Sequence, residues 1–421
     1  MHPTEILDAP TLERNQDAFV ESVIQLEQAA RILDLEDWVV ERLRHPGREV
    51  SVNLPLIRDN GSAATITGYR VQHCGVRGPA LGGLRLCSDA SLTETRARAM
   101  ATTWQLALLD VPFGGSAGAI VCDPAKLSER ELRHIVKEYA TALRGILGAH
   151  SDVILEDEGA NPQILAWILD ACKHNHGHLD PASAIGKPKA LFGIEGHGEA
   201  LAHGIATIVE RVAANRKLAS ARVAIQDRGE YGHALAHACD QRGMQLVALA
   251  DSSGGIYRPS GIAISSLDAW LSEHGMLTGY PDAEGVYNTD VLECACDVLI
   301  AAVPGNPINA AIAENIHASV VVEGVYGAIS APAIDLLEAG GATVMPYLLA
   351  GAGGMAHACL EWTVNTSGHM LLTGEAEEHL QRRLLHAYSA ANNASMRHEV
   401  TLREGAHVAA IELIAEALRL H

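Results

Sequence analysis

The stretch Gly78-Pro-Ala-Leu-Gly-Gly-Leu-Arg-Leu86 and, about thirty residues later, the stretch Val111-Pro-Phe-Gly-Gly-Ser-Ala-Gly-Ala-Ile120 decide how this sequence is interpreted. Each carries paired glycines, which allow backbone conformations and close approaches that a Cβ atom prevents. We interpret the two stretches as glycine turns that bring two backbone segments close together. Residues 91–109 between them place apolar side chains at helical spacing, so a helix is predicted there.

Helices and strands are predicted around these two stretches in the N-terminal half. Residues 11–45 have the apolar spacing of two amphipathic helices, and Asp59-Asn60-Gly61 is a hairpin turn between two alternating runs. Ser128 and Glu131 form a capping box at the start of a further helix. The remaining predicted elements of this half are the strands 48–56, 64–73 and 152–155 and the helices 128–147 and 162–172.

The pattern changes in the second half to short apolar strands separated by helices. This alternation is typical of a parallel sheet covered by helices on both faces. Residues 355–421 return to long amphipathic helices. We therefore predict an α/β fold in three segments, residues 1–185, 186–352 and 353–421. The strands predicted for the middle segment are 223–225, 246–249, 298–301, 320–322 and 343–345.

The composition argues against several classes of partner. The net charge of −20 disfavours nucleic acid and anionic membrane surfaces. No apolar run reaches the ~18 residues of a membrane span, and the N-terminus has no secretion signal, so we expect a cytoplasmic protein with reduced cysteines. No metal site is predicted, because His73, His197, His203 and His357 do not have the spacing of a ligand set.

A degenerate dinucleotide motif follows the first strand of the middle segment. Gln226-Asp-Arg-Gly-Glu-Tyr-Gly232 precedes a helix, and the next strand ends at Asp251, in the position of a ribose-binding acid. Asp227, however, replaces the first glycine of the motif. A carboxylate ~4 Å from a phosphate charge is repelled by up to ~4 kcal/mol at an effective dielectric of ~20. The motif therefore predicts a Rossmann-type fold in which NAD(P) binding is weakened or lost.

Taken together, these segments resemble the Glu/Leu/Phe/Val dehydrogenase family, closest to its glutamate dehydrogenases. The resemblance runs from about residue 15 to residue 418. It implies an N-terminal α/β substrate and oligomerisation domain (1–185), a Rossmann-type NAD- or NADP-binding domain (186–352) and C-terminal helices that pack on the first domain (353–421). It also implies a hexamer. The segments that carry it include Tyr69–His73, Gly82–Arg85, Thr103-Trp104, Pro112–Gly115, Gly186–Pro188, Asp251–Tyr257, Gly353-Gly354 and Glu361-Trp362.

The resemblance further implies where substrate and cofactor bind. The family reaction is the NAD(P)-dependent oxidative deamination of an amino acid, in which two lysines lie in the substrate pocket, a third activates water and an aspartate relays protons. Asp157 keeps the position of the aspartate. Leu81, Gln105 and Ala117 occupy the three lysine positions, and Ala358 replaces a pocket serine or threonine. The cofactor positions are Asp227, Gly229, Gly232, Asp251 and Asn306.

The missing lysines determine the functional hypothesis. No lysine precedes Lys126, and of the nearby cations Arg77 and Arg85 the resemblance makes Arg85 structural. Losing two charged hydrogen bonds, at ~1.5–3 kcal/mol each, weakens carboxylate binding, and losing a general base costs a factor of ~10²–10⁴ in rate. We therefore expect a catalytically impaired protein of amino-acid metabolism that is a regulatory or structural subunit, in a homo-hexamer or a hetero-oligomer with an active paralogue.

Two alternatives remain open. One is an active NAD(P)-dependent oxidoreductase with a changed amino-acid or keto-acid substrate, because the acidic run Glu156-Asp157-Glu158 suits a cationic or uncharged ligand better than glutamate. The other is a sensor that binds an amino acid without converting it. Ligand-dependent stabilisation would distinguish a sensor from a purely structural subunit.

Overall fold

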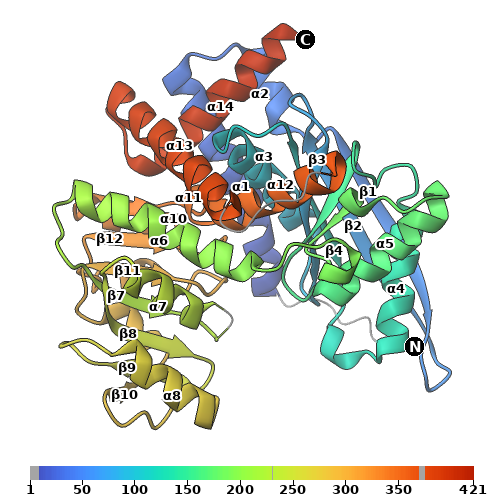
Figure 1. Cartoon of the computed structure of the whole chain (residues 1–421). Helices are drawn as coiled ribbons and strands as arrows, with labels where there is room; N and C mark the ends of the chain where they lie inside the picture. Colours follow the sequence, from blue (N-terminus) through green and yellow to red (C-terminus); the bar gives the residue numbers. More distant parts are fainter. Residues whose placement is uncertain (1–8, 230, 369–374) are drawn as a thin grey trace. The chain divides into compact units, whose positions relative to one another are not determined.

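We describe the protein from a computed structural model of its 421 residues, covering residues 9–229, 231–368 and 375–421 (Figure 1). The chain divides into two compact units. The first unit comprises Met1–Glu195, His357–Ala376 and His407–His421, and the second comprises Gly196–Ala356 and Glu377–Ala406. The three-domain division drawn from the sequence stays a prediction.

A six-stranded sheet with the order β1-β2-β4-β3-β5-β6 forms the centre of the first unit. The predicted hairpin is present, because β1 and β2 pair antiparallel. The other four strands, β4, β3, β5 and β6, run parallel to one another. The strands are β1 (Arg48–Ile57), β2 (Ala63–Cys74), β3 (Ala80–Leu86), β4 (Gly114–Ile120), β5 (Asp152–Glu156) and β6 (Ala184–Ile185).

The two glycine-rich stretches are strands, so their interpretation as turns was wrong. They form the neighbouring parallel strands β3 and β4, and every residue of β4 is buried. Glycine is needed here for close packing. A Cβ on Gly82 would lie 1.7 Å from the Ser116 carbonyl oxygen, and one on Gly83 would lie 2.3 Å from Asp157 Oδ2. The stretches thus bring two backbone segments together, as expected, but inside a sheet.

Helices of the first unit bury an apolar core against this sheet. α4 and α5 contribute Ile135, Tyr139, Ile164 and Ile168 to it. The capping box of Ser128 and Glu131 is present at the start of α4, which ends at Ala142, earlier than predicted. The helices are α1 (Ala9–Leu33), α2 (Asp37–Arg44), α3 (Leu92–Leu108), α4 (Glu129–Ala142), α5 (Pro162–His176), α12 (Ala352–Ser367, which begins in the second unit) and α14 (Leu402–Leu420, likewise).

The second unit contains the predicted parallel sheet, in the order β10-β9-β8-β7-β11-β12-β13. All five predicted strands are present and run parallel. The sequence pattern missed β9 and β10, which extend one edge antiparallel. The bounds are β7 (Arg222–Gln226), β8 (Gln245–Asp251), β9 (Gly254–Tyr257), β10 (Glu284–Val286), β11 (Val298–Ala301), β12 (Val320–Glu323) and β13 (Thr343–Met345).

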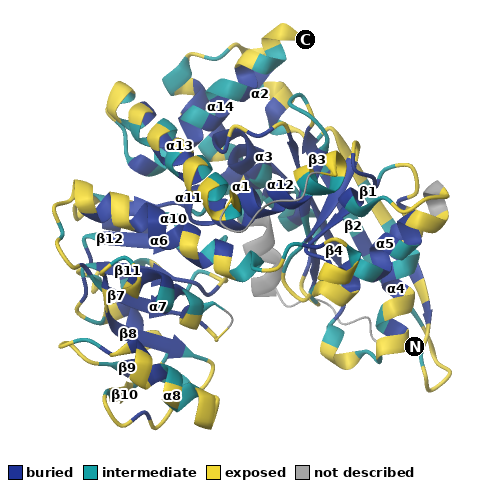
Figure 2. Ribbon diagram, viewed as in Figure 1, coloured by how far each residue is buried: buried dark blue, intermediate teal, exposed yellow. Residues whose placement is uncertain are grey.

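Helices connect these strands, and Figure 2 shows that the central strands are buried. The structure confirms the α/β fold with a Rossmann-type sheet. No helix in the described ranges is long and apolar enough to cross a membrane. The helices are α6 (His197–Asn215), α7 (Gly232–Asp240), α8 (Ile264–His274), α9 (Ala310–Ala313), α10 (Ala331–Ala339), α11 (Tyr347–Ala350) and α13 (Glu375–His398).

Candidate substrate and cofactor sites

Three of the predicted substrate-site residues lie on or directly after neighbouring strands of the first unit. Leu81 on β3 is fully buried, and Ala117 on the adjacent strand β4 is 5% exposed. Asp157 directly follows β5, the other neighbour of β3, and its carboxylate lies against Gly83. These strands therefore carry two buried apolar side chains, Leu81 near the start of β3 and Ala117 in the middle of β4, and Asp157 follows the carboxyl end of β5.

The other two predicted pocket residues come from helices of the same unit. Gln105 lies on α3, which packs against β4, and its side chain is buried. Ala358 is buried on α12, and the ring of Trp362 on that helix contacts Phe113 just before β4, with 4.9 Å between ring centroids. These contacts place Gln105 beside the glycine strands but do not place Ala358 next to the other four.

The neighbouring cations are already paired with carboxylates. Arg77 donates to Asp110 at 2.7 Å, and Arg85 donates to Glu158 at 2.6 Å and also pairs with Glu94. The fully buried ammonium of Lys187 lies 2.6 Å from Glu361, whose carboxylate also accepts the amide hydrogens of Gly186 and Ile194. None of these three cations can replace a pocket lysine without breaking an ion pair.

A buried polar network that sequence reasoning missed supports the glycine strands. The Arg70 guanidinium donates to both Asp152 carboxylate oxygens, with Nε–Oδ2 and Nη2–Oδ1 distances of 3.0 and 2.5 Å. It also donates to the carbonyl oxygens of Gly82 and Gly83 at 3.2 Å and to Ser116 Oγ at 2.8 Å. The only sequence signal was a charged residue at each of two buried strand positions, 82 residues apart.

Glu156 is the acid of this region whose protonation is most perturbed. Partial burial and the nearby carboxylates of Glu361 and Asp157 raise the pKa of Glu156 to about 7. The side chain therefore exchanges a proton near neutral pH, as a general acid or base must. The sequence contains an acidic run, but it could not indicate that Glu156 is the member whose pKa is raised.

We expect replacement of Glu156 by glutamine to change the pH dependence of stability. The pKa in the folded state, about 7, lies above the ordinary value of 4.5, so the folded state binds more protons between these values. The stabilising contribution of Glu156 is therefore complete below about pH 4.5 and is lost as the pH rises through about 7. The melting temperature of the wild type relative to that of Glu156→Gln should therefore fall across this window. The expected fall is only roughly 1–3 °C, because solvent screens a half-buried group. Parallel melting curves from pH 4.5 to 8 would contradict this assignment.

In the second unit, Asp227 caps the loop in which a dinucleotide pyrophosphate would bind. Its Oδ2 accepts hydrogen bonds from the backbone amides of Gly229, Tyr231 and Gly232 at 2.9, 2.9 and 2.7 Å. The side chain is 2% exposed. Amides at a glycine loop and helix N-terminus are the donors that bind phosphate in Rossmann folds. Here a carboxylate of the chain itself occupies them.

The predicted ribose-binding acid also has internal partners. Asp251 Oδ1 accepts from the Ser253 amide at 2.7 Å and from its hydroxyl at 2.6 Å, while Oδ2 accepts from the Leu277 amide at 2.9 Å. Asn288 Nδ2 joins the two acids by donating to the backbone oxygens of Asp227 and Asp251 at 2.7 and 2.9 Å. Asn288 is a further residue that the sequence reasoning missed.

The remaining cofactor position is on a neighbouring strand end. Asn306 follows β11, which pairs with β7, and has a left-handed φ of 57°. Its amide donates to the Gly327 carbonyl oxygen at 2.8 Å. The structure thus places Asp227 and Gly229 in the loop between β7 and α7 and Gly232 at the start of α7. Asp251 ends the neighbouring strand β8, and Asn306 follows the other neighbouring strand, β11.

The similarity to known proteins covers nearly the whole chain. The family model described as Glutamate/Leucine/Phenylalanine/Valine dehydrogenase matches residues 193–421, and the Glu/Leu/Phe/Val dehydrogenase dimerisation domain matches residues 46–174. Glutamate dehydrogenase A2 of Halobacterium salinarum is 35% identical over 397 residues, 93% of this chain and 95% of that protein. The glutamate dehydrogenase of Thermotoga maritima is 34% identical over 403 residues, 94% and 96% of the two chains.

Solved structures agree with these relatives. A hetero-hexameric glutamate dehydrogenase from Thermus thermophilus, in a form described as leucine-bound, has a TM-score of 0.90 at 32% identity, covering 100% of this chain and 99% of that one. The glutamate dehydrogenase of Peptoniphilus asaccharolyticus has a TM-score of 0.84 at 26% identity, with 96% and 98% coverage. The chain therefore belongs to the Glu/Leu/Phe/Val dehydrogenase family.

Proposed function

We propose that this chain is a catalytically impaired glutamate-dehydrogenase-like subunit of amino-acid metabolism, acting in the cytoplasm. The observation that carries the proposal is the absence of a cation at Leu81, Gln105 and Ala117, three buried positions around the glycine strands. A substrate α-carboxylate needs a cationic partner when it leaves water, and the neighbouring Arg77, Arg85 and Lys187 are paired with acids. Asp157 retains an acid without the lysine that would activate water.

The cofactor loop supports the same proposal. The Asp227 carboxylate already accepts the three amide hydrogens that a pyrophosphate would need. A phosphate would have to displace this carboxylate and lie beside its negative charge. We therefore propose that NAD or NADP binds weakly or not at all.

We propose that such a subunit acts through assembly with an active family member. The similar Thermus thermophilus protein is described as a hetero-hexamer, which supports assembly of this chain with a non-identical partner. A chain that keeps the fold but lacks the chemistry is suited to modify a partner's activity or response to ligands. A homo-hexamer without enzymatic activity is the form expected when the partner is absent.

Co-expression with an active family member from the same organism tests this proposal. We expect the purified chain alone to show no amino-acid-dependent reduction of NAD or NADP above a heat-inactivated control. We expect the co-expressed proteins to elute together in a hexamer whose kcat or ligand response differs from that of the active protein alone. Turnover by the isolated chain would refute impairment, and separate elution with unchanged kinetics would refute the subunit role.

A second candidate function, amino-acid sensing, is favoured by a cavity in the first unit. The cavity has a volume of about 230 Å³ and is lined by Arg42, Arg48, Gln72, Gly115 and Ser151, among others. The guanidinium groups of Arg42 and Arg48 are able to form charge-assisted hydrogen bonds with the α-carboxylate of an amino acid. Thermal-shift screening of the twenty amino acids against wild type and Arg48→Gln would identify a sensor. A lack of stabilisation by every amino acid would exclude it.

A further inference from the structure

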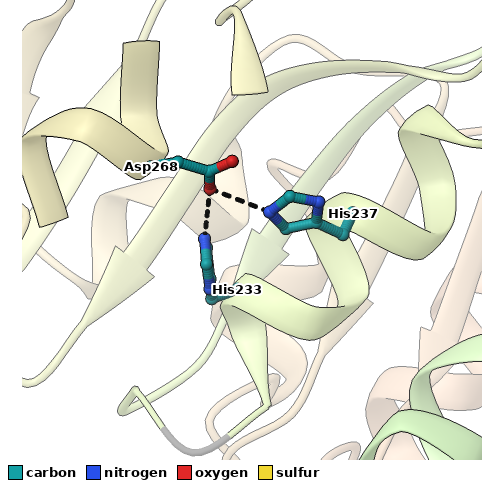
Figure 3. Close-up of side chains that lie close together, drawn as sticks. All are labelled: His233, His237 and Asp268. Atoms are coloured by element: carbon teal, nitrogen blue, oxygen red, sulfur yellow. Dashed lines mark hydrogen bonds and ion pairs between the residues drawn. The ribbon is translucent and has the colours of Figure 1, made fainter. Parts of the chain in front are cut away.

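Two histidines and an aspartate of the second unit converge on its surface (Figure 3). His233 and His237 lie one turn apart on α7, and Asp268 lies on α8. The Nε2 atoms of both histidines are hydrogen-bonded to the same Asp268 oxygen, Oδ1, at 2.7 and 2.8 Å. The three side chains are 37–48% exposed, so an ion in solution can reach them.

The sequence determines why the two rings meet. Residues i and i+4 of a helix lie on one face, so a His-x-x-x-His pair on α7 directs both imidazoles the same way. The two rings are 4.7 Å apart between centroids and perpendicular. This pair was not among the histidines predicted from the sequence to be relevant to metal binding, although its spacing is visible in Gly232-His-Ala-Leu-Ala-His237. Asp268 could not be assigned to it because it lies 31 residues further along the chain.

We propose that His233, His237 and Asp268 form a binding site for a divalent transition-metal ion, and that the ion is zinc. Two imidazole nitrogens and one carboxylate oxygen are a ligand set that zinc accepts, and a water molecule would complete a tetrahedron. The ligand atoms of the three residues all lie within 4.8 Å of one another. Around zinc, bonds of ~2.0–2.1 Å place ligand atoms about 3.3 Å apart.

Small side-chain movements connect the observed geometry to the bound one. The Nε2–Oδ1 distances of 2.7 and 2.8 Å must lengthen by about half an ångström, which rotation of partly exposed side chains allows. Each histidine would then carry its proton on Nδ1 and offer the Nε2 lone pair to the metal. The ion would join the first two turns of α7 to α8, beside the loop that Asp227 caps. The site does not depend on the proposed loss of catalysis.

Zinc titration of the full-length protein tests the proposal. We expect isothermal titration calorimetry with zinc chloride to detect one more binding equivalent in the wild type than in His237→Ala or Asp268→Asn. Loss of a ligand should weaken binding at this site by at least ~100-fold, since even outer-shell partners contribute 10–100-fold. Saturating zinc should raise the melting temperature of the wild type by roughly 5 °C and that of the variants less. Magnesium, which prefers oxygen ligands, should have no such effect.

His45→Ala is the matched control, because His45 also pairs with a single carboxylate, Glu41, at 3.1 Å. This variant should keep the full zinc stoichiometry. Circular dichroism of each metal-free variant establishes that it is folded, and Asp268→Asn preserves the side-chain shape if His237→Ala does not fold. Equal stoichiometry and affinity in the wild type and in both folded site variants would overturn the proposal, leaving only hydrogen bonds between the three side chains.

Discussion

Replacement of Asp227 by glycine is expected to strengthen binding of NAD(H) and to destabilise the protein when cofactor is absent. The wild-type carboxylate accepts three amide hydrogens, so its removal frees three donors for a pyrophosphate and removes a like charge. Hydrogen bonds to charged groups contribute ~1.5–3 kcal/mol each. One amide hydrogen bond to the pyrophosphate, together with removal of the repulsion by the Asp227 carboxylate, should increase the affinity about 100-fold. Loss of the cap should lower the free energy of unfolding by about 2 kcal/mol.

Fluorescence titration with NADH and NADPH measures the change in cofactor affinity, and thermal melting measures the change in stability. Saturating NADH should recover much of the melting temperature that Asp227→Gly loses, because a ligand that binds only the folded state stabilises it. Asp227→Asn is the matched control, since it removes the charge but leaves an amide oxygen near the same donors. It should gain less affinity than glycine. A folded glycine variant that binds neither cofactor would refute the proposal that Asp227 weakens dinucleotide binding.

The sequence predicted the second unit better than the first because parallel strands are short, continuous apolar runs. Residues 223–225 and 298–301 were identified in this way, and both are central strands. The strands β3 and β4 were mistaken for turns, because paired glycines usually mark a change of chain direction. In these strands the glycines instead admit Ser116 and Asp157 at distances that a Cβ would prevent. That requirement arises only from tertiary packing.

The candidate sites show the same division between local and long-range information. The identities of Leu81, Gln105 and Ala117 and the presence of an acid at Asp227 are local, so the sequence was sufficient to question the chemistry. What the Asp227 carboxylate bonds to depends on the conformation of the loop, which the sequence did not reveal. Pairs such as Lys187 with Glu361, which are 174 residues apart, join groups whose proximity no short motif encodes.

The second large effect concerns the buried pair of Arg70 and Asp152, whose side chains are both fully buried. Replacing Asp152 by asparagine leaves the guanidinium without its counter-ion, and removing one partner of a buried pair costs about 3–5 kcal/mol. Gln72 and Ser116 also donate to Asp152, so they lose charge-assisted hydrogen bonds as well. We expect urea denaturation to show this loss for the first unit.

A double variant determines whether the pair stabilises the fold or only avoids an unpaired charge. Arg70→Met with Asp152→Leu removes both charges, and it should be more stable than Asp152→Asn, because hydrophobic replacement of a buried pair is often neutral. Glu36→Gln, which disrupts an exposed ion pair with Arg419, is the matched control and should leave the denaturation midpoint almost unchanged. If Asp152→Asn behaved like this control, the ion pair of Arg70 with Asp152 would not contribute the predicted stability to the first unit. If the double variant were the least stable of all, the pair would contribute net stability to the strands that carry Leu81 and Ala117.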